Sequence, residues 1–238
     1  MAQDFLSDVE LYYSEKVNNG KVEISDEEFH HIKDVMRHEI GDEIYLTDGK
    51  GAIYQSIIQA VDQKKINCKI LSSKHYENKF SNITFCLPRL RNTDRFEFAL
   101  EKCVELGITN FIVFDSTRTV AKGEKIERWQ KVILSAMKQS LRAWLPKVSY
   151  VKSISEIYKL DGTKILFDQN ASQTFQQFLA TNHQSLNTNH FFLFGPEGGF
   201  SQEESRVMSG ERRVKLTDNR LRSETAIVTA ASILTTTL

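Results

Sequence analysis

The chain has 238 residues, of which 40% are apolar and 26% are charged, with only 11 glycines and 3 prolines. This composition excludes disordered, collagen-like and linker-repeat chains, and the length favours two modest domains. No apolar run approaches the roughly eighteen residues of a membrane span, and the N-terminus is acidic where a targeting peptide would be basic. The three cysteines lack the spacing of zinc ligands or of a disulfide framework. We therefore expect a globular, cytoplasmic protein without a metal.

The formal net charge of zero averages over very uneven segments. Residues 1–48 carry thirteen acids against four bases, whereas residues 118–147 carry eight bases against two acids. Such a basic segment in a neutral protein is typical of a site for a polyanion such as RNA. The same charges can also be a solvated helix face, and from charge alone this second interpretation is slightly favoured.

The first seventy residues predict a small, mostly antiparallel β domain. Ser25 and Glu28 form the S-x-x-E pattern of a capping box, and apolar residues at helical spacing predict a helix over 26–38. Three alternating or β-branched stretches predict strands at 43–47, 52–58 and 65–70, with a hairpin turn at 48–51. A polar stretch without periodicity begins at residue 72, so we assign residues 1–72 to a first domain and 73–238 to a second.

In the second domain, predicted strands alternate with predicted helices, which is typical of an α/β domain around a mainly parallel sheet. The strands are expected at 83–87, 110–114, 164–167, 190–194 and 214–216. The helices are expected from Thr93 to Leu106, from Ile126 to Trp144, near 173–180, from Gln202 and from Ser223. The helix ending at Trp144 places its lysines and arginines off the apolar stripe.

Ligands of parallel α/β sheets bind outside the carboxyl ends of the strands, which directs attention to two late loops. The first loop, residues 194–200, reads Phe-Gly-Pro-Glu-Gly-Gly-Phe, and its glycines let a ligand approach the main chain. It matches neither a dinucleotide-binding nor a phosphate-loop pattern, and Glu197 would repel a phosphate. A ligand with hydroxyls, an exocyclic amine or a positive charge fits better. A purely structural turn is an equal alternative.

The second loop lies at residues 216–226 and carries Arg220, Arg222 and a capping Ser223. It leads into a helix of small residues that permits close packing, as at a subunit interface. Taken alone, this loop is better interpreted as the start of a capped C-terminal helix with incidental charges.

In their order along the chain, five motifs resemble the RsmE-type uridine-N3 methyltransferases of 16S ribosomal RNA, a branch of the SPOUT class. Two are the loops themselves, Gly-Pro-Glu-Gly-Gly-Phe-Ser and Leu-x-x-x-x-Leu-Arg-Ser-Glu-Thr-Ala. The others are the helix end Lys-x-x-Glu-Leu-Gly at 102–107, the stretch from Ala136 to Arg142, and the N-terminal His31, Arg37 and Asp48 with their neighbours. The resemblance covers nearly the whole chain. Thr217 departs from it, because the family usually has glycine there.

The resemblance implies a SPOUT-like knotted parallel α/β domain, tied in a deep trefoil knot and preceded by a small PUA-like β-barrel domain that binds RNA. Periodicity alone would have predicted an ordinary doubly wound sheet, because knots are rare. The implied cofactor is S-adenosylmethionine, and the implied partners are 16S ribosomal RNA or the small ribosomal subunit and a second copy of the chain.

The resemblance also implies which residues form the site. The cofactor-binding residues would be Leu166, Leu193, Phe194, Gly195, Pro196, Glu197, Gly198, Gly199, Leu216, Leu221, Ser223 and Thr225. For catalysis, an arginine near the uracil carbonyl oxygens would stabilise the anion that forms when N3 loses its proton, with Arg222 as first choice and Arg142 as second. The residues expected to bind RNA are Arg37, Arg118, Lys138 and Arg142. No general base is assigned, because Glu224 can equally compensate the helix dipole.

Three other functions are alternatives to this one. One is a SPOUT methyltransferase that acts on another RNA. Another is a non-catalytic RNA-binding protein of ribosome assembly, which would not bind the cofactor in a calorimeter. The third is an α/β enzyme acting on a small nucleotide, which the missing phosphate-loop lysine and the basic helix disfavour.

Overall fold

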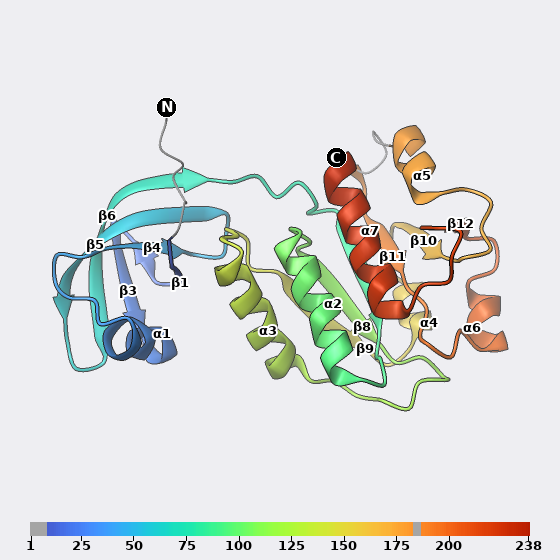
Figure 1. Cartoon of the computed structure of the whole chain (residues 1–238), viewed down its shortest axis with the longest axis horizontal. Helices are drawn as coiled ribbons and strands as arrows, with labels where there is room; N and C mark the ends of the chain where they lie inside the picture. Colours follow the sequence, from blue (N-terminus) through green and yellow to red (C-terminus); the bar gives the residue numbers. More distant parts are fainter. Residues whose placement is uncertain (1–8, 183–186) are drawn as a thin grey trace. The chain divides into compact units, whose positions relative to one another are not determined.

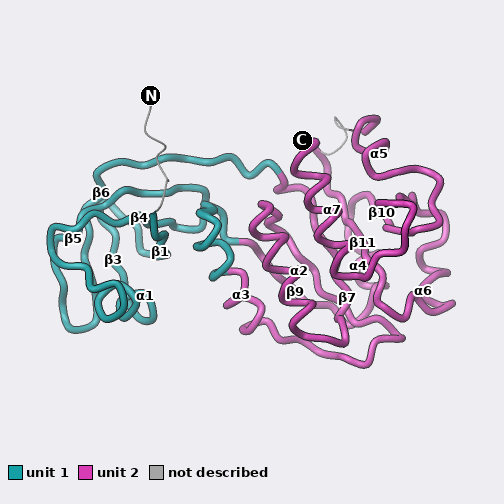
Figure 2. The backbone as a smooth tube through the Cα atoms, in the orientation of Figure 1, with its two compact units in different colours: residues 1–79, 134–145 teal, residues 80–133, 146–238 magenta. Residues whose placement is uncertain are grey.

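The computed structural model describes residues 9–182 and 187–238, so the acidic start of the chain lies outside the described residues. The chain divides into two compact units (Figure 2). The first contains the residues up to Lys79 together with Leu134–Leu145, and the second contains Phe80–Ile133 and Pro146–Leu238. The predicted division at residue 72 did not include the segment Leu134–Leu145 in the first unit. No helix in the described ranges is long and apolar enough to cross a membrane.

The first unit is built on a six-stranded sheet in the order β1-β4-β5-β6-β3-β2 (Figure 1). The strands are β1 (Leu11–Tyr13), β2 (Val17–Asn18), β3 (Lys21–Ser25), β4 (Glu43–Thr47), β5 (Ala52–Val61) and β6 (Lys65–His75). All pairs are antiparallel except the parallel pair of β1 and β4. Alternate strand residues are buried against Phe29 and Ile32. The predicted strands and hairpin turn are confirmed.

The predicted helix over 26–38 is shorter than expected. It consists of α1 (Asp26–His30), which continues into one π-helical turn, η1 (His31–Val35). The predicted capping box does not form, because Asp26 has a φ of +58° and the Ser25 hydroxyl donates to the Asp26 carboxylate instead. Glu28 is then available for another partner, and it forms an ion pair with Lys138.

The end of α3 (Ile126–Gln139) and the following turn complete the first unit. The helix ends before the predicted Trp144, since Leu141 adopts a φ of +55°. The Trp144 indole N–H donates to the Tyr76 carbonyl at 2.8 Å, and the Gly51 N–H donates to the Ala143 carbonyl at 2.9 Å. A Cβ on Gly51 would lie 2.5 Å from the Trp144 ring, so only glycine permits this approach. Such pairing over some ninety residues of chain leaves no local pattern in the sequence.

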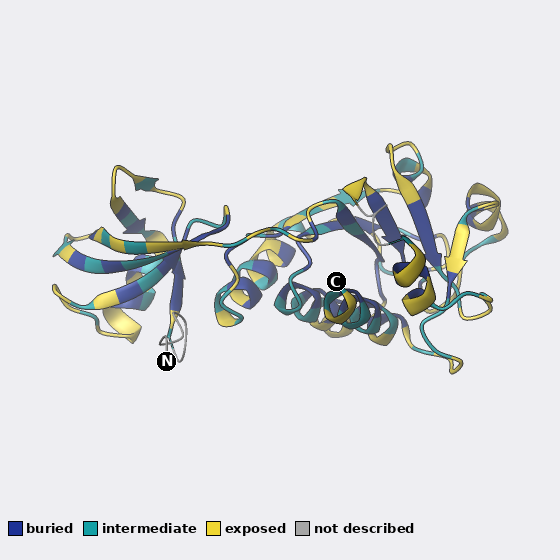
Figure 3. Ribbon diagram, turned by 90° about the horizontal axis from the view of Figure 1, so that it is seen from above, coloured by how far each residue is buried: buried dark blue, intermediate teal, exposed yellow. Residues whose placement is uncertain are grey.

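The second unit contains a six-stranded parallel sheet in the order β12-β10-β11-β7-β8-β9. Its strands are β7 (Ile83–Pro88), β8 (Asn110–Phe114), β9 (Lys147–Val151), β10 (Thr163–Phe167), β11 (His190–Leu193) and β12 (Arg212–Val214). The central strands are buried along nearly their whole length (Figure 3), as expected when helices cover both faces of a parallel sheet. The predicted parallel α/β architecture is confirmed.

Helices cover both faces of this parallel sheet. The helices are α2 (Thr93–Glu105), α4 (Ile154–Ile157), α5 (Phe175–Asn182), α6 (Gln202–Val207), α7 (Ser223–Thr237) and the first half of α3. α2 and α7 lie side by side on one face (Figure 1). On the other face, Ile154, Ile157 and Met208 pack with Cys86 and Leu193. The small residues Ala230 and Ala231 of α7 are already buried within the unit, so they do not by themselves indicate a subunit interface.

Candidate functional site

The two loops singled out in the sequence meet at the carboxyl ends of neighbouring strands. One loop follows β11 and leads to α6, and the other follows β12 and leads to α7. The Ser223 hydroxyl donates to the Gly195 carbonyl at 2.6 Å and so joins the loops. A capping box forms at the start of α6, with Ser201 and Glu204 as its two members. The threading that a trefoil knot requires stays a prediction.

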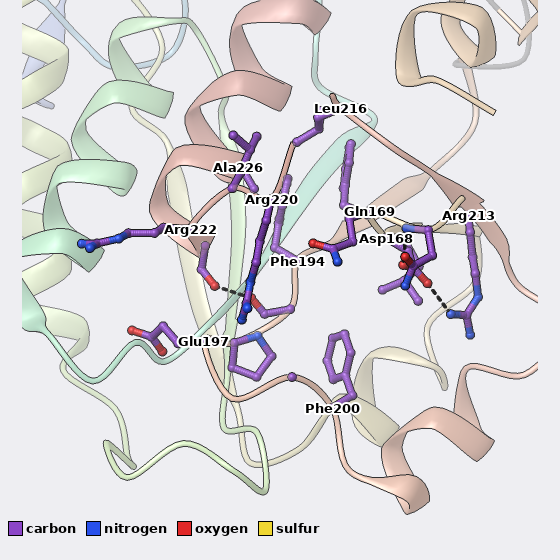
Figure 4. A pocket seen from close by; sticks show the side chains of 18 of the residues that line it. Asp168, Gln169, Phe194, Glu197, Phe200, Arg213, Leu216, Arg220, Arg222 and Ala226 are labelled. Carbon is purple, nitrogen blue, oxygen red and sulfur yellow. Dashed lines mark hydrogen bonds and ion pairs between the residues drawn. The ribbon is translucent and has the colours of Figure 1, made fainter. Parts of the chain in front are cut away.

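These loops enclose a cavity of about 900 Å³ (Figure 4). Nine of the twelve predicted cofactor residues line it: Leu166, Phe194, Gly195, Pro196, Glu197, Gly199, Leu216, Leu221 and Ser223. Three do not. Leu193 is buried in the core on the α4 side, Gly198 lies against Arg118, and Thr225 is exposed on α7. Cofactor contact by any of the twelve stays a prediction.

A third segment of the wall carries no motif and was not predicted from the sequence. Asp168, Gln169 and Asn170 follow β10 directly and line the same cavity. The Asp168 carboxylate pairs with the Arg213 guanidinium at 2.7 Å, which fixes it at the cavity edge. The rule that ligands bind beyond the carboxyl ends of parallel strands would have found this segment, because the preceding strand was predicted.

The cavity has the chemical features that an adenosine-containing cofactor with a sulfonium charge requires. Leu166, Phe194, Leu216 and Leu221 offer apolar surface for a base. The glycine loop, residues 194–200, offers main-chain groups. A Cβ on Gly195 would lie 3.4 Å from the Phe200 ring and would narrow the cavity. The wall carries the exposed Glu197 carboxylate, which suits a sulfonium cation, alongside three arginines, Arg213, Arg220 and Arg222. The residues present therefore fit S-adenosylmethionine.

Two arginines of the second loop lie differently in this cavity. Arg222 is the exposed residue that precedes the first turn of α7, and its side chain extends away from Phe194 and Gln169 (Figure 4). Arg220 also lines the cavity. Arg222 and Glu197 lie on the same side of the cavity in this view. The catalytic role is predicted for Arg222, and no role is predicted for Arg220.

Glu204 ties the glycine loop to the loop that follows β8. Its carboxylate accepts the Ser201 N–H at 2.7 Å and the Thr117 N–H at 2.9 Å, and the residue is only 7% exposed. Burial raises the pKa of the Glu204 carboxyl, but the hydrogen bonds from these main-chain groups outweigh it and hold the pKa below its usual value. The anion is thus the form that the fold stabilises.

A second cavity of about 610 Å³ lies on the other side of Glu197, which lines both spaces. Its other lining residues are Arg91, Asn92, Arg95, Arg118, Thr119, Val120 and Gly198. Here the Arg118 guanidinium donates to the Gly198 carbonyl at 3.2 Å. Of the predicted RNA-binding residues, Arg118 alone lies in the second unit.

The remaining predicted RNA-binding residues belong to the first unit. Arg37 is exposed, with a φ of +58°, and Arg142 is exposed after the end of α3. Lys138 is bound to Glu28 in an ion pair. The structure therefore does not bring Arg142 and Arg222 into one compact unit, and RNA contact by these residues stays a prediction.

A parallel-sheet unit with a loop-built cavity, joined to a small β unit, is the architecture that the resemblance to SPOUT methyltransferases implies. Residues 77–235 match the RNA methyltransferase domain family, and residues 24–71 match the RNA methyltransferase PUA domain. The chain belongs to the RNA methyltransferase family. The parallel α/β domain, the PUA-like domain and the enzyme class implied by the resemblance are confirmed.

Individual relatives are similar over nearly their full length. The ribosomal RNA small subunit methyltransferase E of Bacillus subtilis is 28% identical over 88% of this chain and 87% of its own. The structure of ribosomal RNA small subunit methyltransferase E from Neisseria gonorrhoeae, bound to S-adenosyl methionine, is 26% identical, with a TM-score of 0.82 over 96% of this chain and 97% of its own. A predicted RNA methyltransferase from Thermotoga maritima is 30% identical, with a TM-score of 0.72 over 94% and 96%.

Proposed function

We propose that this chain transfers a methyl group from S-adenosylmethionine to N3 of one uridine in 16S ribosomal RNA. One observation carries the proposal: two motifs of the resemblance enclose one cavity of suitable size and chemistry. Neither motif matches a phosphate-loop pattern. The relatives named for methylation of the small-subunit RNA span the same length of chain.

Different residues of the cavity would bind different parts of the cofactor. Leu166, Leu216 and Leu221 would pack on the adenine faces, while main-chain groups of residues 195–199 would bind its edge. Glu197 would favour the sulfonium charge. When bound, the cofactor supplies an electrophilic methyl group, which forms a bond to N3 as its bond to sulfur breaks. The main task of the protein is then to hold N3 in line with that bond.

Uracil N3 carries a proton, and its lone pair attacks only when that proton leaves for solvent or a base. The negative charge then spreads to the two carbonyl oxygens of the base. Arg222, at the start of α7 and on the Glu197 side of the cavity, would donate to these oxygens and stabilise the anion. Arg142 remains the second choice for this role.

The test combines a product assay with a blocked cavity. The protein is incubated with tritiated S-adenosylmethionine and a 16S RNA transcript or small subunits, and the labelled nucleoside is identified by digestion and mass spectrometry. We expect N3-methyluridine. Ala226 lines the cavity from α7, and leucine is a good helix former, so Ala226→Leu should keep the helix. Because the larger side chain fills part of the cavity, cofactor binding measured by calorimetry should be lost.

The matched control is Ala180→Leu, the same change at an exposed position of α5 that lines neither cavity. It should bind the cofactor like the wild type. Equal binding by Ala226→Leu would remove this cavity from the cofactor site, and a methylated base other than N3-methyluridine would refute the proposed reaction.

The proposal includes three statements about the setting of the reaction. The substrate is the 16S RNA of the small subunit, the protein works in the cytoplasm, and it acts as a homodimer. The relatives' names support the first, and the match to a PUA domain in the first unit supports RNA as the partner.

A further inference from the structure

The second cavity is a binding site that the proposed reaction has not yet used. It lies where the chain leaves β7 and β8, beside the N-terminus of α2 and the outer side of the glycine loop. Glu197 and Gly198 form part of its wall, so a ligand there would lie next to the methyl-transfer site. Its volume of about 610 Å³ is enough for a nucleotide.

The lining is strongly basic. Three arginines face one carboxylate, that of Glu197. Arg118 is held by the Gly198 carbonyl, and Arg95 lies 3.6 Å from the Glu224 carboxylate at its Nε. Arg91 is exposed and makes no hydrogen bond or ion pair with any residue that the structure describes. The cavity therefore has net positive charge and at least one arginine available for a ligand.

Unsatisfied buried groups point the same way. Thr119 lines the cavity and is 6% exposed, yet its hydroxyl has no hydrogen-bond partner among the described residues. Arg89, two residues before Arg91, is 2% exposed, and its Nε and Nη1 have no hydrogen-bond partner among the described residues. The Arg89 guanidinium lies over the rings of Phe96 and Trp129. Arg89 lies outside the lining, so its guanidinium adds positive charge to this region but no donor to the cavity wall.

The carboxylates nearest to Arg89 are engaged elsewhere. Glu97 forms an ion pair with Arg128, and Asp115 accepts hydrogen bonds from the Tyr150 hydroxyl and the Gly123 N–H. The positive charge of Arg89 is therefore not balanced by a directly bonded carboxylate. Arg89 is two residues from Arg91 in the chain, so this charge adds to the field of the three lining arginines.

We propose that the second cavity binds a backbone phosphate of the RNA strand beside the target uridine, with Arg91 and Arg118 as its principal ligands. The free N–H groups at the start of α2 would supply further donors. This inference rests on the proposed RNA methylation and names the part of the substrate that holds the uridine in place.

The lining of the second cavity favours a nucleotide as its ligand over the carboxylate of the methionine part of S-adenosylmethionine. Val120 is 81% exposed in a lining that is otherwise charged or polar. An exposed apolar side chain beside arginines suits a ligand that carries both a phosphate and a base face. A carboxylate alone would leave this side chain without a function.

The test replaces Arg91 by glutamine, because Arg91 has no structural partner to lose. Each phosphate contact contributes about −0.7 to the slope of log K against log salt for single strands, so Arg91→Gln should flatten the slope by about that amount. At 0.15 M salt the affinity for a 16S RNA transcript should fall by about fourfold. The KM for RNA should rise by a similar factor, while cofactor affinity in the calorimeter stays unchanged.

The control is Arg206→Gln, the loss of an exposed arginine on α6 that lines neither cavity. It should alter neither the slope nor the affinity. An unchanged slope for Arg91→Gln would overturn the inference, and so would a loss of cofactor affinity, which would assign the cavity to the cofactor's carboxylate. If the wild type transfers no methyl group to RNA, the proposed function itself fails, which is a separate result.

Discussion

Glu204 provides the sharpest prediction about how the site is held together. Its carboxylate accepts two main-chain N–H groups, one from the start of α6 and one from the loop that carries Arg118. Glu204→Ala removes both hydrogen bonds. A hydrogen bond to a charged group contributes about 1.5–3 kcal/mol, and the exposed Thr117 can regain water in the variant, so we expect a net loss of about 3 kcal/mol.

For a unit of this size, a loss of about 3 kcal/mol lowers the melting temperature by roughly 6–12 °C. Circular dichroism during heating measures it, and hydrogen exchange at the Thr117 amide reports the local effect. The control is Glu203→Ala, an exposed neighbour in the same first turn, which should change stability by only a few tenths of a kcal/mol. If both variants melt at the same temperature, the carboxylate does not join the loops.

The pH dependence gives an independent check. The hydrogen bonds hold the folded-state pKa of Glu204 below its usual value of 4.5, so the anion's stabilisation is fully present above pH 4.5 and is lost as the pH falls through the folded-state pKa. The difference in melting temperature between the wild type and Glu204→Gln should therefore shrink under acid conditions. A difference that grows with acid would contradict the assignment.

Three further predictions concern the reaction and the assembly. Arg222→Lys keeps the charge but loses the planar fork, so single-turnover methylation should slow by roughly two orders of magnitude with cofactor affinity unchanged, and a wild-type rate would remove Arg222 from catalysis. Arg142→Ala should weaken RNA binding and flatten its salt dependence by about one phosphate contact. If this variant instead loses methylation while its RNA affinity is unchanged, Arg142 has the catalytic role and Arg222 does not. Sedimentation at micromolar concentration should give a species of twice the 27.4 kDa chain mass, and a clean monomer would contradict the dimer.

The parts of the fold that the sequence predicted are those that local chemistry controls. The strand at 110–114, the start of α6 at Gln202 and the start of α7 at Ser223 all agree with the structure. The capping box predicted at Ser25 does not form, because Asp26 takes a left-handed conformation that its sequence neighbours do not reveal. Helix α3 ended early for a similar reason at Leu141.

The part of the site that could be predicted is the loop whose own sequence indicates ligand binding. The glycine loop has an unusual composition, and its place after a strand indicated a ligand. Asp168 and Arg213 carry no motif, and their pairing depends on the parallel register of β10 and β12, which only the fold determines. Arg91 and Thr119 are likewise separated in sequence, and the second cavity exists only because β7 and β8 are neighbours.

The basic segment at 118–147 shows why a charge count alone could not locate an RNA site. Two of its bases are neutralised within the fold, Lys138 by Glu28 and Arg128 by Glu97. The segment also divides between the two compact units, since residues 134–145 belong to the first. Arg118 is the member that lies in a cavity, where it joins two arginines from outside the segment. A polyanion is recognised by charges that share one surface with room for a ligand, so the grouping around Arg118 is better evidence for RNA binding than the sum of charges along the helix.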